Sequence, residues 1–241
     1  AHQVAAYLNW MPGPLVGLLQ RAVQLLPTSR KYMSFDFKVK RFCSGLGMDP
    51  VRRHLTWMGS IPQDQVAPYL QNPASPAFSW EPHDQGLVEG IQQLDFSTYL
   101  AEDLLVKLDR ATMLTSLEGR VPYLDHQVVE AMAGLPTPHK LRVLDAKRVL
   151  KKAMEGRLPE PVLKRPKKGF GIPLAEWLRG PLKPLLDEHL CPTYLTHQGL
   201  FSPQPVGRMV QQHLRGVKDH RKPLWTLLVF QMWWKNFQPT I

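Results

Sequence analysis

Along most of this chain, apolar residues recur at helical spacing rather than at every second position. In the clearest stripe, within 98–117, an apolar residue returns every three or four positions; the stripe consists of Leu100, Leu104, Leu108 and Ala111. This period predicts an amphipathic helix with one face on a core, and we expect a long helix over Asp95–Leu117. Pro122 disfavours helical geometry at Val121, so this helix should end close to Gly119.

Capping residues and helix breakers predict shorter helices downstream. Asp125 can cap a helix that Gly134 ends. Asp145 can cap another over 146–155, which Gly156 stops. A proline at the first position of a helix loses nothing by its missing N–H, and two prolines fit that position, Pro161 and Pro173.

The last forty residues predict two more helices. Ser202-Pro203 opens one of them, Gly216 lies past its end, and its apolar face consists of Val206, Met209, Val210 and Leu214. The final helix, about Lys222–Phe237, is apolar nearly all round. A helix of that kind is usually enclosed by other elements, so we expect it to be largely buried.

Strand signals are poor, and the 23 prolines mark loops rather than sheet edges. The stretch 73–86, with three prolines, is the best candidate for a surface loop. With 241 residues and 44% hydrophobic content the chain can bury a sizeable core. We therefore expect a mainly α-helical structure.

Composition limits the expected cellular location and the kinds of chemistry that the chain could support. No apolar run reaches the length of a membrane span and no secretory leader opens the sequence, so we expect a cytoplasmic protein. The two cysteines, Cys43 and Cys191, form no metal, redox or disulfide motif. The nine histidines form no ligand set of the His-Glu-x-x-His kind, so no metal site on protein ligands is predicted.

The net charge is +10 and is unevenly placed. Residues 139–168 hold eleven Lys or Arg against three acidic residues. Such a strip can serve nucleic acid, an anionic membrane or a phosphate-bearing substrate. Without interleaved aromatic residues or a nucleic-acid-binding motif, the phosphate interpretation is favoured.

Three blocks of charged residues stand out in the middle of the chain. They read LVKLDRATM at 105–113, SLEGRVPYLD at 116–125 and RPKKGFGIPLAEW at 165–177. Charges this dense beside apolar helix positions are costly to bury unless they pair or meet a ligand. The plain structural alternative is a solvated helix followed by a basic loop.

The three blocks, in this order and spacing, resemble the C-terminal part of asparagine synthetase B-type, glutamine-dependent amidotransferases, a family related to β-lactam synthetases. The resemblance is strongest over 94–180 and continues more weakly over 1–241. It implies the C-terminal part of an α/β adenine-nucleotide α-hydrolase-like (PP-loop ATP pyrophosphatase) synthetase domain. Neither the glutaminase nucleophile nor the Ser-Gly-Gly-x-Asp-Ser loop of the family occurs in the sequence. The expected structure is therefore a helical fragment without most of the parallel sheet, inactive by itself.

The resemblance also implies an activity. Members of the family join ATP and a carboxylate into an acyl-adenylate, which ammonia from glutamine then converts into an amide; asparagine from aspartate is the default product. The implied partners are ATP with Mg²⁺, bound largely by residues outside this sequence, and a glutaminase domain in cis; the chain could also form a homodimer. Two alternatives stay open: amidation of another carboxylate, such as a sugar acid or a β-lactam precursor, and a non-catalytic basic helical binding module.

Lys167 is the leading catalytic candidate, because the family places this lysine at the α-phosphate of ATP, where charge grows as pyrophosphate leaves. Lys168 is a competing neighbour. Gly169 allows close approach of the backbone to a ligand. Phe170 and Trp177 are expected to anchor this loop to the core rather than to touch substrate.

Glu118 and Arg120 follow the predicted helix end, where side chains often reach into a cleft. In the β-lactam synthetase branch the matching glutamate supports a catalytic base, so the resemblance implies a catalytic role for Glu118 and a phosphate-binding role for Arg120. A structural ion pair between them is the equal alternative. We expect Glu118, Arg120 and Lys167 to converge on one cleft.

Four further residues of the blocks are expected to support the site rather than to react: Lys107, Asp109, Arg110 and Asp125. Lys107 and Arg110 share one helix face with Asp103, at i, i+4 and i+7. The structural interpretation of that face is an exposed row of ion pairs, each contributing a few tenths of a kcal/mol.

Overall fold

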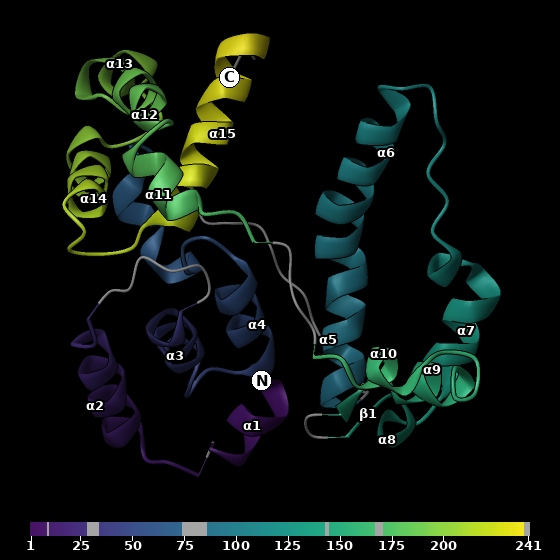
Figure 1. The fold of residues 1–241 in the computed structure, drawn as a ribbon. Helices are drawn as coiled ribbons and strands as arrows, with labels where there is room; N and C mark the ends of the chain where they lie inside the picture. The colour runs from purple at the N-terminus through teal and green to yellow at the C-terminus, as the bar shows by residue number, and fades with distance from the viewer. Residues whose placement is uncertain (9, 28–33, 74–85, 143–144, 167–170, 239–241) are drawn as a thin grey trace. The chain divides into compact units, whose positions relative to one another are not determined.

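The computed structural model describes residues 1–8, 10–27, 34–73, 86–142, 145–166 and 171–238 (Figure 1). Three predicted site residues, Lys167, Gly169 and Phe170, lie outside these ranges, as does most of the predicted loop 73–86. The chain divides into two compact units. Unit 1 comprises residues 1–8 and 79–169, and unit 2 comprises 9–78 and 170–241.

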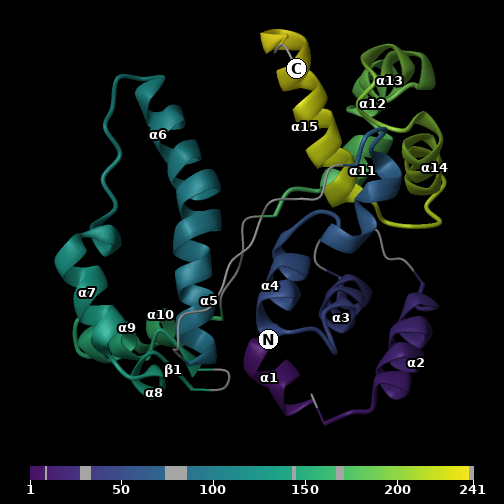
Figure 2. The ribbon, with the colours of Figure 1, turned by 180° about the vertical axis from the view of Figure 1, so that it is seen from behind.

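Unit 1 is built on one long helical rod (Figures 1 and 2). It consists of α5 (Leu87–Asp95), the π-helical η3 (Phe96–Leu105) and α6 (Val106–Met113). The change to π-helical geometry begins where hydroxyl groups compete for backbone carbonyls: Ser97 Oγ donates to the Gln93 carbonyl at 2.9 Å and Thr98 Oγ1 to that of Leu94 at 2.6 Å. The predicted long helix is confirmed, although it ends at Met113, a turn earlier than expected.

The remaining described elements of unit 1 are short. They are α1 (His2–Tyr7), η4 (Pro122–Leu124), α7 (His126–Gly134), α8 (Thr137–Lys140), β1 (Leu141–Arg142), β2 (Asp145–Ala146), α9 (Arg148–Ala153) and α10 (Glu160–Lys164). The cap predicted at Asp125 is confirmed, since its Oδ1 accepts the Gln127 N–H at 2.9 Å and α7 ends at Gly134. Pro161, predicted as the first residue of its helix, is the second residue of α10, still within the first turn.

The helix predicted over 146–155 is wrong at its start. Asp145 pairs with Arg142 in an antiparallel two-stranded sheet, and Lys147 adopts the left-handed conformation at φ 59°. The helix α9 therefore cannot begin before Arg148. The Asp145 carboxylate caps no helix; it forms ion pairs with Lys151 and Arg148 at 2.6 and 3.3 Å.

The described secondary-structure elements of unit 2 are helices, apart from an isolated antiparallel bridge between Leu70 and Phe201. Its elements are α2 (Gly13–Gln24), α3 (Phe35–Ser44), α4 (Pro50–Met58), η1 (Gln63–Gln65), η2 (Ala67–Tyr69), α11 (Leu174–Arg179), α12 (Lys183–His189), α13 (Pro192–Gln198), α14 (Pro203–Leu214) and α15 (Arg221–Phe237). The main core lies among α11–α15 and consists of Leu178, Leu186, Leu190, Leu195, Val206, Met209, Val210, Leu224, Leu227 and Leu228. Pro173, predicted as the first residue of α11, is instead its N-cap.

The two C-terminal helices match their predicted limits, but their burial differs from the prediction. In α14, Val206, Met209 and Val210 face the core as expected. The last helix, α15, is buried along one face only, and its opposite face exposes Trp225, Val229, Met232 and Trp233 by 39–46%. The prediction of a largely buried α15 is wrong, because an apolar composition all round does not specify which face finds neighbours.

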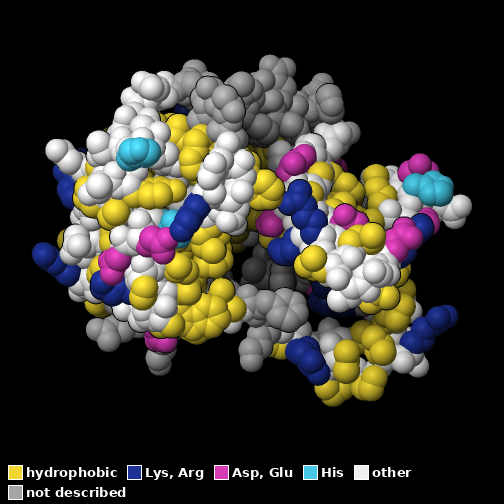
Figure 3. Space-filling view, turned by 90° about the horizontal axis from the view of Figure 1, so that it is seen from above, with side chains coloured by type: hydrophobic (Ala, Val, Ile, Leu, Met, Phe, Trp, Pro, Cys, Tyr) yellow, Lys and Arg dark blue, Asp and Glu magenta, His cyan; other side chains and the backbone are white. Residues whose placement is uncertain are grey.

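The described part of the chain is mainly helical, as predicted, and its only sheet is β1–β2. Apolar and charged side chains intermingle on the face shown in Figure 3. Several exposed large apolar residues are in unit 1, among them Leu114 and Leu117. None of the described helices has both the length and the apolar composition needed to cross a membrane.

Candidate functional site

The rod of unit 1 ends in a tight helix C-cap that starts the second charged block. The Leu117 N–H donates to the Thr112 carbonyl at 3.1 Å and the Ser116 N–H to that of Met113 at 3.0 Å. Ser116 itself takes the left-handed conformation, at φ 58°. These two bonds and the left-handed residue form a Schellman motif, in which glycine is the usual left-handed residue. The helix thus stops here rather than near Gly119.

After this cap the chain runs back along α6. A Cβ atom on Gly119 would lie 3.2 Å from Leu108 Cγ and 3.3 Å from Thr112 Oγ1. Glycine therefore permits a close approach of the returning segment to the helix. Glu118 and Arg120 flank this contact on either side.

Glu118 and Arg120 form an ion pair, with Oε1 and Nη2 2.8 Å apart. Their side chains are 68% and 83% exposed. An exposed pair of this kind contributes about 0–1 kcal/mol to stability. The structural ion pair is therefore present, and both heads remain open to solvent and to any ligand.

The residues expected to support the site lie at the surface. Lys107 pairs with Asp103 at 3.5 Å in the exposed row predicted from the helix spacing. Asp109 and Arg110 are also exposed on α6. Asp125 supports the segment through the cap of α7, as described above.

A pocket of about 750 Å³ lies beside the basic stretch of unit 1. It is lined by Asp145, Lys151, Glu155, Gly156, Leu158, Glu160, Leu163 and Lys164. Both lysines are already paired, Lys151 with Asp145 and Lys164 with Glu160. The hydrogen bond from Lys151 is the main cause that lowers the pKa of Asp145 below its usual range.

This pocket does not fit a polyphosphate by itself, because three carboxylates face two lysines that are already neutralised. Its lining ends at Lys164, one residue before the basic loop 165–173. Lys167 and Gly169 lie outside the described residues, so their convergence with Glu118 and Arg120 stays a prediction. Among the described residues no group of three or more His, Cys, Asp or Glu side chains could hold a metal ion.

The basic loop leads into α11 of unit 2. The Glu176 and Trp177 N–H groups both donate to the Pro173 carbonyl at 3.0 Å. Ala175 and Leu178 point into the core, with 1% and 0% exposure, whereas Trp177 is 39% exposed. Leu178 belongs to the main core and Leu174 packs against it. The anchoring roles of Trp177 and Phe170 stay predictions.

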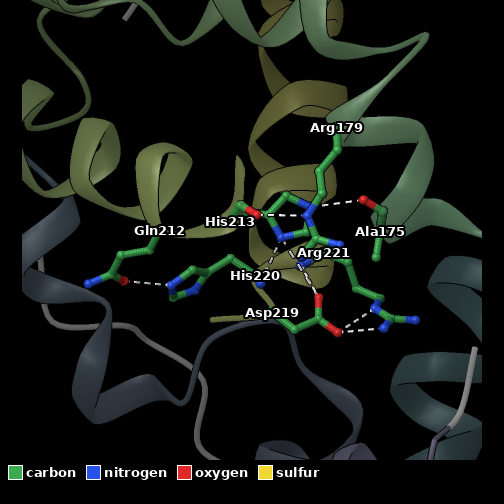
Figure 4. Close-up of polar contacts among 7 residues, drawn as sticks. All are labelled: Ala175, Arg179, Gln212, His213, Asp219, His220 and Arg221. Carbon is green, nitrogen blue, oxygen red and sulfur yellow. Dashed lines mark hydrogen bonds and ion pairs between the residues drawn. The ribbon is translucent and has the colours of Figure 1, made fainter. Parts of the chain in front are cut away.

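A polar network on the buried side of α11 was missed in the sequence (Figure 4). His213, with 0% exposure, bonds through Nε2 to the Ala175 carbonyl at 3.2 Å and through Nδ1 to the His220 N–H at 3.1 Å. Arg179 Nε returns a bond to the His213 carbonyl at 2.8 Å. The missed signal was the position of His213, three, four and seven residues after the core residues Val210, Met209 and Val206.

The amino-acid sequence was compared with protein-family models and with known proteins. A family model described as asparagine synthase matches residues 7–235, which span both units. A Mycobacterium bovis protein, provisionally named as a glutamine-hydrolysing asparagine synthetase, is 38% identical over 155 residues, or 64% of this chain. The glutamine-hydrolysing asparagine synthetase 1 of Bacillus subtilis is 32% identical over 150 residues, or 61% of this chain.

The aligned stretch covers 23% of the length of each of these two relatives. The alignment with this chain therefore spans less than a quarter of the length of either relative. No solved structure matches the chain.

Proposed function

Because this chain belongs to the asparagine synthase family, we propose that it forms the C-terminal part of the synthetase domain of a glutamine-dependent, ATP-driven amide-forming ligase. The observation that carries the proposal is the family match over residues 7–235, which includes all three charged blocks. The names of the relatives support aspartate as the acceptor and glutamine as the source of ammonia. A glutaminase domain in the same polypeptide would supply that ammonia.

In the proposed reaction, an oxygen of the substrate carboxylate attacks the α-phosphate of ATP. Pyrophosphate leaves, and an acyl-adenylate remains. Ammonia then attacks the acyl carbon, so that an amide forms, AMP leaves and one proton is released. ATP enters with Mg²⁺ on its phosphates, and the described residues supply no ligand cluster for that ion.

Lys167 is proposed to stabilise the negative charge that grows on the phosphates as pyrophosphate leaves. An ammonium group aimed at developing charge lowers the barrier by about 3 kcal/mol in comparable sites. Exposure of the Glu118–Arg120 pair supports a role for both groups at a ligand, because neither head has to be released from a buried partner. In this proposal Arg120 contacts phosphate and Glu118 orients the attacking amine or its neighbours.

The test uses the full-length protein with Lys167→Ala and, as a matched control on the adjacent residue, Lys168→Ala. We expect Lys167→Ala to lower aspartate-dependent ATP–pyrophosphate exchange at least 100-fold, the loss typical when one charge-stabilising group is removed. Glutamate release from glutamine should persist, because that reaction uses a different site. Lys168→Ala should retain exchange within about threefold of the wild type, well short of that loss.

Exchange near the wild-type rate in Lys167→Ala would remove this residue from the mechanism. Equal losses in both variants would show that the net charge of the loop, rather than Lys167 in particular, is what matters.

A further inference from the structure

The hydrogen bonds around His213 determine where its ring proton lies. Nδ1 faces the N–H of His220, which can only donate, so Nδ1 must accept (Figure 4). Nε2 faces the carbonyl oxygen of Ala175, which can only accept, so Nε2 carries the proton. His213 is therefore neutral in this arrangement, with both nitrogens used.

The neutral ring joins three elements of unit 2. Its Nε2–H reaches α11 through Ala175, and its Nδ1 holds the turn before α15 through the backbone of His220. Arg179 of α11 adds a second hydrogen bond between α11 and α14, because its Nε–H donates to the His213 carbonyl. α11 thus has a polar tie to the end of α14 in addition to its apolar contacts with the core.

The turn after α14 is itself held in place. Asp219 accepts the N–H of Arg221 at 3.0 Å and its Nε at 2.7 Å, and the Arg221 guanidinium lies over the Phe37 ring. The His220 ring bonds through Nε2 to Gln212 Oε1 at 2.8 Å. These contacts leave the His220 N–H little freedom to move away from the His213 ring.

The charges around His213 disfavour a second proton. Burial is the largest cause that lowers its pKa, and Arg179 and Arg221 lower it further, whereas Asp219 and the bond to Ala175 act in the opposite direction. Burial also lowers the pKa of His220 to about 4, with help from the nearby Lys218 and from His213. Asp219 Oδ1 lies 3.8 Å from His213 Nδ1, which is ion-pair distance for a protonated ring but beyond hydrogen-bond distance (Figure 4).

Protonation of His213 would set two donors, Nδ1–H and the His220 N–H, against each other. The ring could relieve this conflict only by turning toward Asp219, which Arg221 already occupies, and turning would break the bond to Ala175. Losing the bond between Nδ1 and the His220 N–H therefore also means losing the bond between Nε2 and the Ala175 carbonyl.

We infer that His213 is a positioning residue: its neutral ring holds α11, and with it the described end of the basic loop at Ile172–Pro173, against α14 and α15. The anchor is sensitive to acid, because it needs an unprotonated Nδ1. The effect on catalysis rests on the proposed function, in which the basic loop carries Lys167; the anchor itself does not depend on that proposal.

The first experiment measures amide hydrogen exchange of residues 174–180 in the chain described here, by mass spectrometry, at pH 7.5 and pH 5.5 and corrected for intrinsic exchange rates. One proton taken up on opening by a histidine of ordinary pKa raises the opening constant about tenfold over this interval. We expect a loss of protection of that size in α11. The helix α2, which contains no histidine, should keep its protection.

Two variants separate the anchor from general stability. His213→Gln cannot titrate but keeps a carbonyl and an amide, so it should reduce the pH dependence of α11 exchange; any dependence that remains is assigned to His220, whose pKa is also lowered. His197→Gln, which removes an exposed histidine of α13, should preserve that dependence. Equal acid sensitivity in His213→Gln and the wild type would overturn the inference.

Because His213→Gln could fail to fold, the wild type provides an independent readout. Histidine NMR of the ¹³C- and ¹⁵N-labelled chain should show the ring of His213 still in the neutral Nε2–H form at about pH 6.5, where a histidine of ordinary pKa is half protonated. A ring that titrates at the ordinary pKa would contradict the anchor.

In the full-length protein, His213→Gln should flatten the acid limb of the ATP–pyrophosphate exchange profile. If α11 exchange behaves as expected and this profile does not change, the anchor stands and its link to the proposed function fails.

Discussion

At the scale of single residues, the described charged side chains of the first two blocks lie mostly at the surface, and two ion pairs involve them. Glu118 with Arg120, and Lys107 with Asp103, are exposed ion pairs that contribute little to stability. Fold stability therefore does not require the charges at these positions. A requirement for binding or catalysis would explain them, and this agrees with the proposed role of the second block.

Ser116 offers a test of the helix end before that block. It occupies a left-handed position at φ 58°, which costs a non-glycine residue about 1 kcal/mol. We expect Ser116→Gly to raise the free energy of unfolding by up to about 1 kcal/mol, less the extra entropy that glycine gives the unfolded chain. Urea unfolding of the wild type and Ser116→Gly would measure this. A decrease of about 1 kcal/mol, the cost of glycine at an ordinary position, would contradict the Schellman assignment.

Some residue contacts could be predicted from the sequence and others could not. The Asp125 cap was predicted because a cap needs only local spacing. The same reasoning failed at Asp145, whose carboxylate finds Lys151 and Arg148 instead. Ser116 gave no such signal, because serine is an unusual residue at a left-handed helix end. His213 did give one, its place on the apolar face of α14, but its partners Ala175 and His220 lie outside that helix and local spacing does not identify them.

At the scale of elements, the sequence predicted where most helices lie better than which of their faces are buried. The long rod of unit 1, α7, α14 and α15 all appear near their expected positions. The rod's stripe of Leu100, Leu104 and Leu108 is only half-buried, and Ala111 is exposed. Helical periodicity identifies a face, but the neighbours that cover it come from distant parts of the chain.

Two apolar residues of α15, one turn apart, provide a matched comparison of burial. Leu228 is 0% exposed in the core, whereas Met232, one turn later, is 40% exposed. We expect Leu228→Ala to lower the free energy of unfolding by about 3 kcal/mol, since it leaves a cavity, and Met232→Ala by less than about 1 kcal/mol. Chemical denaturation of both variants checks this. Similar losses in the two would mean that Met232 is as enclosed as Leu228.

At the scale of the whole molecule, the chain was expected to form one helical portion of a larger synthetase domain. The family and the helical character are confirmed, whereas the division into two compact units was not foreseen. The boundary in the second half of the chain falls between residues 169 and 170, inside the basic loop. No composition shift marks that boundary, because the motif on both sides reads as one continuous block.

Stability should depend on pH through the buried histidines of unit 2. The pKa of His220 is lowered to about 4, so the unfolded chain binds more protons than the folded chain between about pH 4 and the ordinary histidine pKa of about 6.5. The contribution is complete above pH 6.5 and is lost as pH falls toward 4. Urea unfolding monitored by tryptophan fluorescence at pH 7 and pH 4.5 should show most of this loss in the wild type.

The matched control for this prediction is His220→Gln, which keeps a hydrogen-bonding side chain but cannot titrate. Its stability at pH 7 can be lower than that of the wild type, but the difference between pH 7 and pH 4.5 should shrink. An unchanged difference would mean that His220 does not titrate as its burial requires.

The proposed reaction makes a direct prediction about oxygen atoms. If a carboxylate oxygen of the acceptor attacks the α-phosphate of ATP, that oxygen leaves with AMP when ammonia displaces it. The measurement is mass spectrometry of the products that the full-length protein forms from ATP, glutamine and aspartate labelled with ¹⁸O in its side-chain carboxylate. We predict one ¹⁸O atom in AMP and none in pyrophosphate; label in inorganic phosphate together with ADP, or AMP without label, would contradict the acyl-adenylate route.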